Sequence, residues 1–292
     1  MIKKIEILRS TKPKIQLRMT DGYKKVSKII GKNRLNTVCE EARCPNIYDC
    51  WDRETATIMI LGDVCTRSCG FCSVKTGRPP AIDFKEPIRI GEAVKDMNLK
   101  HVVLTSVDRD DLKNDFGATI WAKTIFEIRK IAPNCSIEVL TPDFQGYEPA
   151  LQMIFDTKPD IFSHNVECVE RISKKVRVQA IWSRSLAVLQ KSVDNGLLTK
   201  SGMMVGLGET NDEVLDTMQQ VAELGVKIFT VGQYLQPTNK HLPVNRYVEK
   251  SEFDMYKVDG LKMGLKIVES GPLVRSSYHA DEQAILALKS GN

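Results

Sequence analysis

The 292-residue chain lacks any apolar run long enough to suggest a membrane helix. A helix that crosses a bilayer needs roughly 20 consecutive apolar residues, and no stretch of this sequence approaches that length. The first six residues, MIKKIE, also lack the apolar core of a secretory signal. No internal repeat or low-complexity segment breaks the chain. We therefore expect a protein without a membrane partner that resides in the cytoplasm.

A second C-x2-C pair is also missing. Cys69 and Cys72 form one such pair, and without another the sequence cannot complete a zinc knuckle. A thioredoxin-type redox pair at the same two positions would leave Cys65 unexplained. The chain has eight cysteines in all, and thiols that must stay reduced indicate a reducing compartment. Cys135 and Cys168 stand alone and are predicted to be small buried side chains.

The other six cysteines form two triplets. One has the spacing C-x4-C-x5-C and the other C-x3-C-x2-C; the members are Cys39, Cys44 and Cys50, then Cys65, Cys69 and Cys72. A structural zinc site closes its coordination sphere with four ligands. A four-iron cluster that is held by three cysteines leaves one iron free for an outside ligand. An open iron is useful for chemistry, so the triplets predict reactive sites rather than structural ones.

The second triplet lies in the loop DVCTRSCGFC, directly after the strand-like residues 56–62. Gly70 is expected to permit a tight turn, and the aromatic Phe71 precedes the last cysteine. This loop resembles the signature of the radical S-adenosylmethionine (SAM) enzymes. The resemblance implies that the three cysteines hold a [4Fe-4S] cluster whose open iron binds SAM, with Phe71 shielding one side. In that family an electron from the cluster cleaves SAM to methionine and a 5′-deoxyadenosyl radical.

Two further motifs narrow the family. The first triplet lies in TVCEEARCPNIYDCW, residues 37–51, and the C-terminal part contains RSSY, residues 275–278. Both are similar to motifs of the lipoyl synthases, and the resemblance spans about residues 36–280. It implies that the first triplet holds an auxiliary [4Fe-4S] cluster with Ser277 as fourth ligand, and Ser276 as the alternative. Oxygen is a weak ligand for this metal beside thiolates, as a sacrificial cluster requires.

The resemblance also implies the reaction and its participants. Two sulfur atoms are inserted at C6 and C8 of an octanoyl chain that is amide-linked to a carrier lysine, and the product is lipoyl. Two SAM molecules are consumed, and the auxiliary cluster is the sulfur donor. Cys65, Cys69, Cys72 and Ser277 are the expected catalytic residues. The implied partners are an octanoylated lipoyl carrier domain or H protein, a reducing electron donor and an iron–sulfur carrier that restores the cluster.

Two other classes stay open. Another radical SAM enzyme, biotin-forming or methylthio-transferring, is disfavoured by the upstream triplet together with the terminal RSSY motif. A non-catalytic metal or redox module is disfavoured by the open iron site and by the repeated β/α pattern of the chain. Metal analysis tests the second alternative: about eight irons per chain supports two four-iron clusters, whereas stoichiometric zinc supports a non-catalytic metal module.

Strand-like and helix-like stretches alternate through the middle of the chain. This pattern predicts an α/β fold, a partial TIM-type (β/α)6 barrel with N- and C-terminal extensions. We expect strands at 56–62, 101–106, 136–141, 161–166, 201–206 and 228–235, and helices at 89–98, 118–131, 147–156, 183–195, 211–224 and from Ser251, where Ser251 and Asp254 would form a capping box. The expected segments are an N-terminal extension (1–54), the barrel (55–270) and a C-terminal extension (271–292).

Polar and glycine residues at the ends of these strands are the predicted SAM contacts, because catalytic groups of such barrels lie at the C-terminal ends of the strands. They are Thr105, Ser106 and Asp108 after the second strand, Asn165 and Glu167 after the fourth, and Gly206, Gly208 and Glu209 after the fifth. A helix N-cap or a turn is the structural alternative for each of them. The sequence from Gly206 to Glu209 is no phosphate loop, since it lacks Gly-Lys-Ser/Thr.

Charge is concentrated at the N-terminus. Residues 1–34 carry eleven Lys/Arg and two Asp/Glu, a balance of +9, so the rest of the chain is −4 within a total of +5. Tyr23 is the only aromatic residue of this segment, and no nucleic-acid-binding motif is present, so we expect no nucleic-acid partner. We expect an arm that packs across the main domain; a solvated tail is the alternative. An acidic carrier domain would be its natural counterpart.

Overall fold

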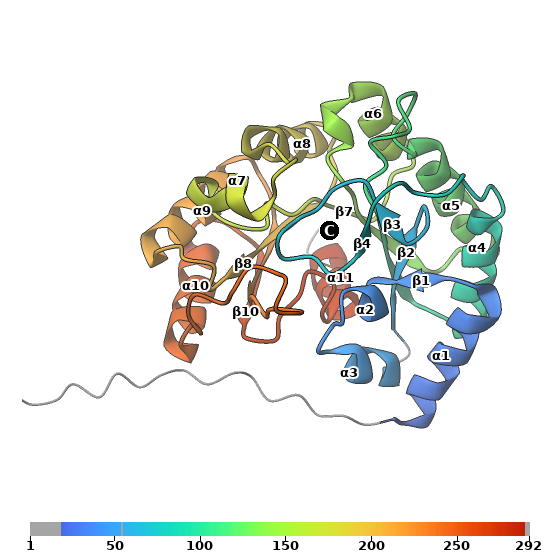
Figure 1. The fold of residues 1–292 in the computed structure, drawn as a ribbon, viewed down its shortest axis with the longest axis horizontal. Helices are drawn as coiled ribbons and strands as arrows, with labels where there is room; N and C mark the ends of the chain where they lie inside the picture. Colours follow the sequence, from blue (N-terminus) through green and yellow to red (C-terminus); the bar gives the residue numbers. More distant parts are fainter. Residues whose placement is uncertain (1–18, 54, 290–292) are drawn as a thin grey trace, which may run out of the picture.

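One curved sheet organises the computed structural model, which describes residues 19–53 and 55–289 (Figure 1). Within these residues eight strands follow one another from edge to edge: β1 (Asn36–Thr37), β2 (Thr57–Ile60), β5 (His101–Ser106), β6 (Ser136–Leu140), β7 (Ile161–Ser163), β8 (Thr199–Val205), β9 (Ile228–Gln233) and β10 (Ile267–Gly271). The strands from β2 to β10 are parallel, whereas β1 pairs antiparallel with β2. Because β1 and β10 are opposite edges, the barrel stays open.

Helices cover the outer face of this sheet (Figure 1). They are α4 (Glu86–Met97), α5 (Ala118–Ile131), α6 (Glu148–Asp156), α7 (Glu170–Val176), α8 (Trp182–Asp194), α9 (Asn211–Glu223) and α10 (Lys250–Lys262), with a 3₁₀ turn, η1 (Phe144–Gly146), before α6. Each of the longer helices buries an apolar stripe; in α5 the stripe contains Ile120, Trp121, Ile125 and Ile128. The central strands β2 and β5 to β9 are largely buried on both faces, as parallel strands under helices must be.

The predicted α/β partial barrel is confirmed, and all six predicted strands are present as β2 and β5 to β9. Among the elements that were missed are α7 and the edge strands β1 and β10. The predicted start of the last barrel helix is wrong by one residue, since α10 begins at Lys250. Its capping box is formed by Glu249 and Glu252, whose carboxylate accepts the Glu249 amide at 2.9 Å, so Ser251 and Asp254 are not its members.

The N-terminal extension forms three helices, α1 (Asp21–Asn33), α2 (Val38–Glu41) and α3 (Ile47–Asp52). Val26 and Ile30 of α1 are buried, and Tyr23 stacks on Tyr48 with ring centroids 5.3 Å apart. The described part of the predicted basic arm is therefore a packed helix, and residues 1–18 lie outside the described residues. Among the described residues, no helix has the length and apolar character that crossing a membrane requires.

The last helix, α11 (Ala280–Lys289), closes the N-terminal end of the barrel. Its Ala284 and Ala287 pack with Ile161, Ile228 and Ile267, which are the first residues of β7, β9 and β10. Figure 1 shows α11 inside the ring of strands, close to the helices of the N-terminal extension. The described part of the N-terminal extension and α11 therefore lie side by side. Where the three segments divide remains a prediction.

Candidate active site

The second cysteine triplet lies in the loop after β2, at the C-terminal end of the strands. Main-chain hydrogen bonds fix this loop on both sides: the Gly70 amide donates to the Val176 carbonyl at 2.8 Å, and the Leu242 amide donates to the Gly70 carbonyl at 3.0 Å. Gly70 lies in the predicted turn, in which the Cys72 amide donates to the Cys69 carbonyl at 3.1 Å, and glycine has a second role here. A Cβ at this position would lie 2.9 Å from the Leu242 side chain, so glycine permits the close approach.

Cys65, Cys69 and Cys72 are partly buried and close enough to influence one another electrostatically. Burial raises the pKa of Cys65 to about 11 and that of Cys69 to about 12, and the neighbouring carboxylate of Asp108 acts in the same direction. The Cys65 sulfur also accepts backbone N–H groups from Arg67 at 3.4 Å and Asp108 at 3.3 Å. These thiols stay protonated until a metal binds, and metal binding then releases their protons.

Polar groups with unused hydrogen-bonding capacity lie around this loop. The buried Ser106 hydroxyl and the side-chain amide oxygen (Oδ1) of Asn165 have no hydrogen-bond partner among the described residues. Buried polar atoms almost always have a partner in a native protein, so these two are free to accept or donate hydrogen bonds to a polar ligand. Burial raises the pKa of the Glu167 carboxyl, and the positive charge of Arg177 opposes this rise without cancelling it. Thr105, by contrast, already donates its hydroxyl to the Leu140 carbonyl at 2.9 Å.

The loop after β8 contains the glycines that the sequence singled out. Gly206 has φ 94° and Gly208 has φ 112°, values that favour glycine. The Glu209 carboxylate accepts the amides of Gly206 at 2.5 Å and Leu207 at 2.9 Å, so it shapes its own loop. Phe71 packs against the core that is formed around β8 and β9. SAM binding by the loop residues stays a prediction.

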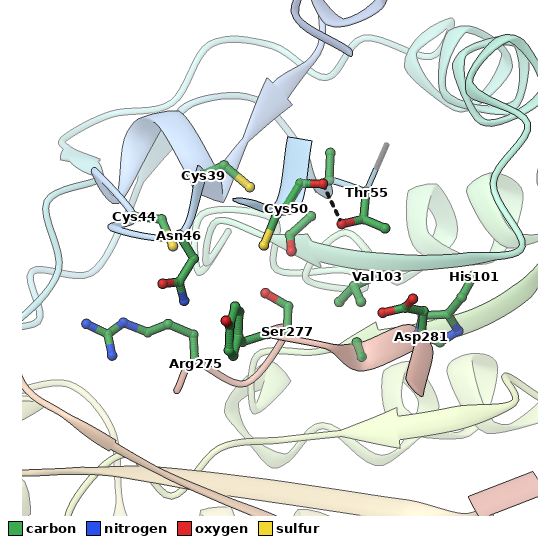
Figure 2. A pocket seen from close by; sticks show the side chains of 14 residues that line it. Cys39, Cys44, Asn46, Cys50, Thr55, His101, Val103, Arg275, Ser277 and Asp281 are labelled. Carbon is green, nitrogen blue, oxygen red and sulfur yellow. Dashed lines mark hydrogen bonds between the residues drawn. The ribbon is translucent and has the colours of Figure 1, made fainter. Parts of the chain in front are cut away.

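The first triplet lines a pocket, which we call the auxiliary pocket (Figure 2). Its lining includes Cys39, Cys44, Cys50, Arg275, Ser277 and Tyr278. Figure 2 shows the three sulfur atoms on one side and Ser277, on the segment before α11, facing them from the other. Ser276 is absent from the lining. Burial raises the pKa of all three thiols, that of Cys39 to about 12.

Side-chain contacts hold the C-terminal segment over the first triplet. The Asn46 amide donates to the Leu273 carbonyl at 2.7 Å, and Arg53 pairs with Asp281 at 3.0 Å and with Glu282 at 2.7 Å. The sequence predicted that this segment folds back toward the cysteines only on the condition that Ser277 is a ligand. The structure places it there, although the cysteines and the serine lie at opposite ends of the chain.

Arg275 gives the auxiliary pocket an unbalanced positive charge. Its guanidinium is largely buried, donates to the Val274 carbonyl at 2.6 Å and faces Cys44. No carboxylate of the described residues pairs with it, and burial lowers its pKa. A buried cation without a partner is costly. The charge is balanced when thiolates and an anionic cluster fill the pocket, so the residues present fit an iron–sulfur cluster.

Comparison with known proteins decides the family. Residues 59–221 match the radical SAM superfamily. The lipoyl synthase of Rubrobacter xylanophilus is 56% identical over 90% of this chain and 82% of its own length; that of Flavobacterium psychrophilum is 49% identical over 93% and 94%. The mitochondrial lipoyl synthase of Nematostella vectensis is 47% identical over 94% and 95%. This chain belongs to the lipoyl synthase family. Lipoyl synthases use SAM and two [4Fe-4S] clusters.

Solved structures of radical SAM enzymes show the same fold at low identity. Methylornithine synthase has a TM-score of 0.53 and 12% identity, covering 90% of this chain and 82% of its own. Streptococcus suis SuiB, in a structure with bound S-adenosylmethionine, has a TM-score of 0.59 and 10% identity, covering 78% of this chain and 55% of its own. At this identity the likeness concerns the fold alone.

Three residues near the SAM-type loop of this lipoyl synthase were missed in the sequence. Arg67 lies within the triplet, His241 contacts the Cys72 carbonyl through Nε2 at 3.0 Å, and Arg177 donates to the main-chain carbonyl of Asn165 at 3.0 Å. The position of Arg67 between two cysteines was a signal that could have been used. Nothing in the sequence links His241 or Arg177 to the triplet, because they come from other loops of the barrel.

Proposed function

We propose that the two cysteine triplets of this lipoyl synthase divide the reaction between them. Cys65, Cys69 and Cys72 hold the cluster that binds SAM, whereas the auxiliary pocket holds the sulfur donor with Ser277 as its oxygen ligand. When bound, SAM and its cluster supply the radical that opens an unactivated C–H bond. The observation that carries the assignment is the meeting of Ser277 and three cysteines from the other end of the chain in one pocket.

The substrate is an octanoyl chain that is amide-linked to a lysine of a carrier domain or H protein. Each sulfur replaces one hydrogen, first at C6 and then at C8. The protein's task is to orient the chain and to exclude water from the reacting carbons. Val103 of β5 and Ala56, next to β2, add apolar groups to the lining of the auxiliary pocket, which suits an alkyl chain that must approach the sulfur donor from the barrel.

The polar strand-end residues bind SAM. The unpartnered oxygen atoms of Ser106 and Asn165 support this role, because a ligand with amino, carboxylate and hydroxyl groups would satisfy them. Glu167 and Asp108 lie beside the cysteine loop and complete the polar side of the site. Gly206 and Gly208 let the backbone of their loop approach the ligand, while Thr105, Glu209 and Phe71 support the walls.

The remaining participants follow from the chemistry. A reducing electron donor must supply the SAM cluster, and an iron–sulfur carrier must rebuild the donor cluster after it is dismantled. Both requirements, and six thiols that must stay reduced, favour the cytoplasm. The excess of Lys and Arg in residues 1–34 complements an acidic carrier domain and would speed docking. No nucleic acid or membrane takes part.

Two variants test the division of labour, with anaerobically reconstituted protein, SAM, reductant and an octanoylated carrier peptide. Cys69→Ala should abolish 5′-deoxyadenosine formation and leave the auxiliary cluster assembled. Cys44→Ala should retain SAM cleavage and add no sulfur to the peptide, as read by mass spectrometry. Cys135→Ala is the matched control, since this cysteine is buried and belongs to neither triplet. Sulfur insertion by Cys44→Ala, or SAM cleavage by Cys69→Ala, would refute the assignment.

A further inference from the structure

Arg67 lies inside the SAM-cluster loop and is only 5% exposed. Its guanidinium contacts three carboxylates at once. It binds Asp110 through Nε at 2.7 Å and Nη2 at 2.9 Å, Asp143 through Nη2 at 2.6 Å, and Asp108 through Nη1 at 3.2 Å. We call these four residues the Arg67 clamp. So many charge-assisted bonds to one buried group fix its position closely.

The clamp joins the cysteine loop to two other strand ends. Asp108 and Asp110 follow β5, and Asp143 lies between β6 and η1. Thr66 strengthens the same junction, because its hydroxyl donates to the Asp108 carbonyl at 3.0 Å and accepts the Asp110 amide at 3.0 Å. The loop that carries Cys65 therefore cannot shift relative to β5 without breaking several charged contacts.

Two residues of the Arg67 clamp also form hydrogen bonds to Cys65. The backbone amides of Arg67 and Asp108 donate to the Cys65 sulfur at 3.4 Å and 3.3 Å. Hydrogen bonds to the sulfur atoms of a cluster and the local charge help to set its reduction potential. Hydrogen bonds and local charge both act on this cluster. The two N–H donors favour its reduced, more negative state, whereas the three carboxylates of the Arg67 clamp disfavour that state unless the Arg67 charge balances theirs.

We propose that Arg67 is a positioning residue that holds the Arg67 and Asp108 amides on the Cys65 sulfur and thereby raises the reduction potential of the SAM cluster. The inference rests on the proposed assignment of the SAM cluster to Cys65, Cys69 and Cys72. The role of Arg67 goes beyond that assignment, because it explains how side chains that are not ligands of the SAM cluster allow the electron donor to reduce it.

Potentiometry of the SAM cluster, followed by electron paramagnetic resonance, tests this role. Arg67→Lys keeps the charge and loses the fork of donors, whereas Arg67→Gln loses both. In each variant we expect the ratio of reduced to oxidised cluster at a fixed potential to fall about tenfold, which is 59 mV for one electron. The control is Arg129→Lys, since Arg129 pairs with Asp160 at 2.7 Å at the other end of the strands and should leave the potential unchanged.

The outcomes separate the explanations. An unchanged potential in both variants overturns the proposal, and a shift in Arg67→Gln alone shows that charge acts without the amides, which overturns it as well. Failure of the proposed assignment would appear differently, as a SAM-responsive signal that survives Cys69→Ala. If a variant takes up no SAM cluster, amide hydrogen exchange of the full-length protein before cluster loading decides. Faster exchange in residues 65–72 and 106–110 than in Arg129→Lys supports the clamp, and unchanged protection refutes it.

Discussion

Gly232 of β9 controls how closely the RSSY segment can approach the barrel. A Cβ at this position would lie far inside van der Waals contact with the carbonyl oxygen of Val274, and 3.3 Å from the guanidinium of Arg275. The backbone of Gly232 has no positive φ, so alanine would not strain the strand itself. The effect of Gly232→Ala is therefore purely steric, and it falls on the segment that carries Ser277.

The size of the effect follows from the close packing of the interior. The Val274 carbonyl belongs to the main chain, and it must retreat by about 1 Å to regain ordinary contact. Overpacking of this kind typically costs about 1–3 kcal/mol of unfolding free energy. Since Arg275 and Ser277 follow directly, the retreat also moves the proposed oxygen ligand away from the cysteines. We expect Gly232→Ala to bind the auxiliary cluster poorly and to produce little lipoyl product.

Iron analysis, thermal unfolding and product formation check this prediction together. The native protein should hold about eight irons and Gly232→Ala about four, with SAM cleavage retained because the SAM loop is untouched. Gly271→Ala is the matched control: its Cβ would meet the Val274 side chain at 3.4 Å, an ordinary contact. If Gly232→Ala retains about eight irons and native product yield, the packing argument is wrong.

Three further changes probe the ligand, the pH dependence and the barrel interior. Ser277→Cys should stabilise the auxiliary cluster and slow release of the first sulfur, and Ser277→Ala should lose that cluster, as read by iron content and rapid-quench mass spectrometry; native behaviour of both would exclude Ser277 as ligand. Burial lowers the pKa of His164 from 6.5 to about 4. Because the unfolded chain takes up this proton at a higher pH than the folded protein, the free energy of unfolding is highest above pH 6.5 and falls by about 3 kcal/mol as the pH drops toward 4. Denaturant titrations should show this loss relative to His164→Gln; parallel pH profiles would contradict it. Lys200→Met should lower the free energy of unfolding by about 3–5 kcal/mol, because it leaves the fully buried Glu138, 3.0 Å away, without the Lys200 charge. Chemical denaturation measures this loss. Recovery of stability on adding Glu138→Gln would support the reason, and a loss below about 1 kcal/mol would contradict it.

Features that depend on residues close together in the sequence could be predicted from the sequence. The strands β2 and β5 to β9 were predicted because buried parallel strands consist of short apolar runs separated by helices. Cys65, Cys69 and Cys72 could be grouped because three residues of one short loop cannot lie far apart. Cys135 and Cys168 were expected to be buried, and they are. The motifs also identified the family, which the relatives confirm.

Contacts between distant segments required the tertiary structure. The placement of Ser277 rather than Ser276 in the auxiliary pocket depends on the path of the segment between β10 and α11. The three partners of Arg67 come from loops whose proximity is set by the register of β5 and β6. The edge strand β10 was missed because a short strand carries a weak local pattern, and packing decides its conformation. The helix α1 was missed although its sequence offered a signal, namely the Thr20 N-cap and the helical spacing of Val26, Ile29 and Ile30. The sequence by itself determined the fold class, the chemistry of the thiols and their grouping; only the fold decided which oxygen, cation and amide meet each sulfur, because those groups approach one another through chain closure rather than through sequence spacing.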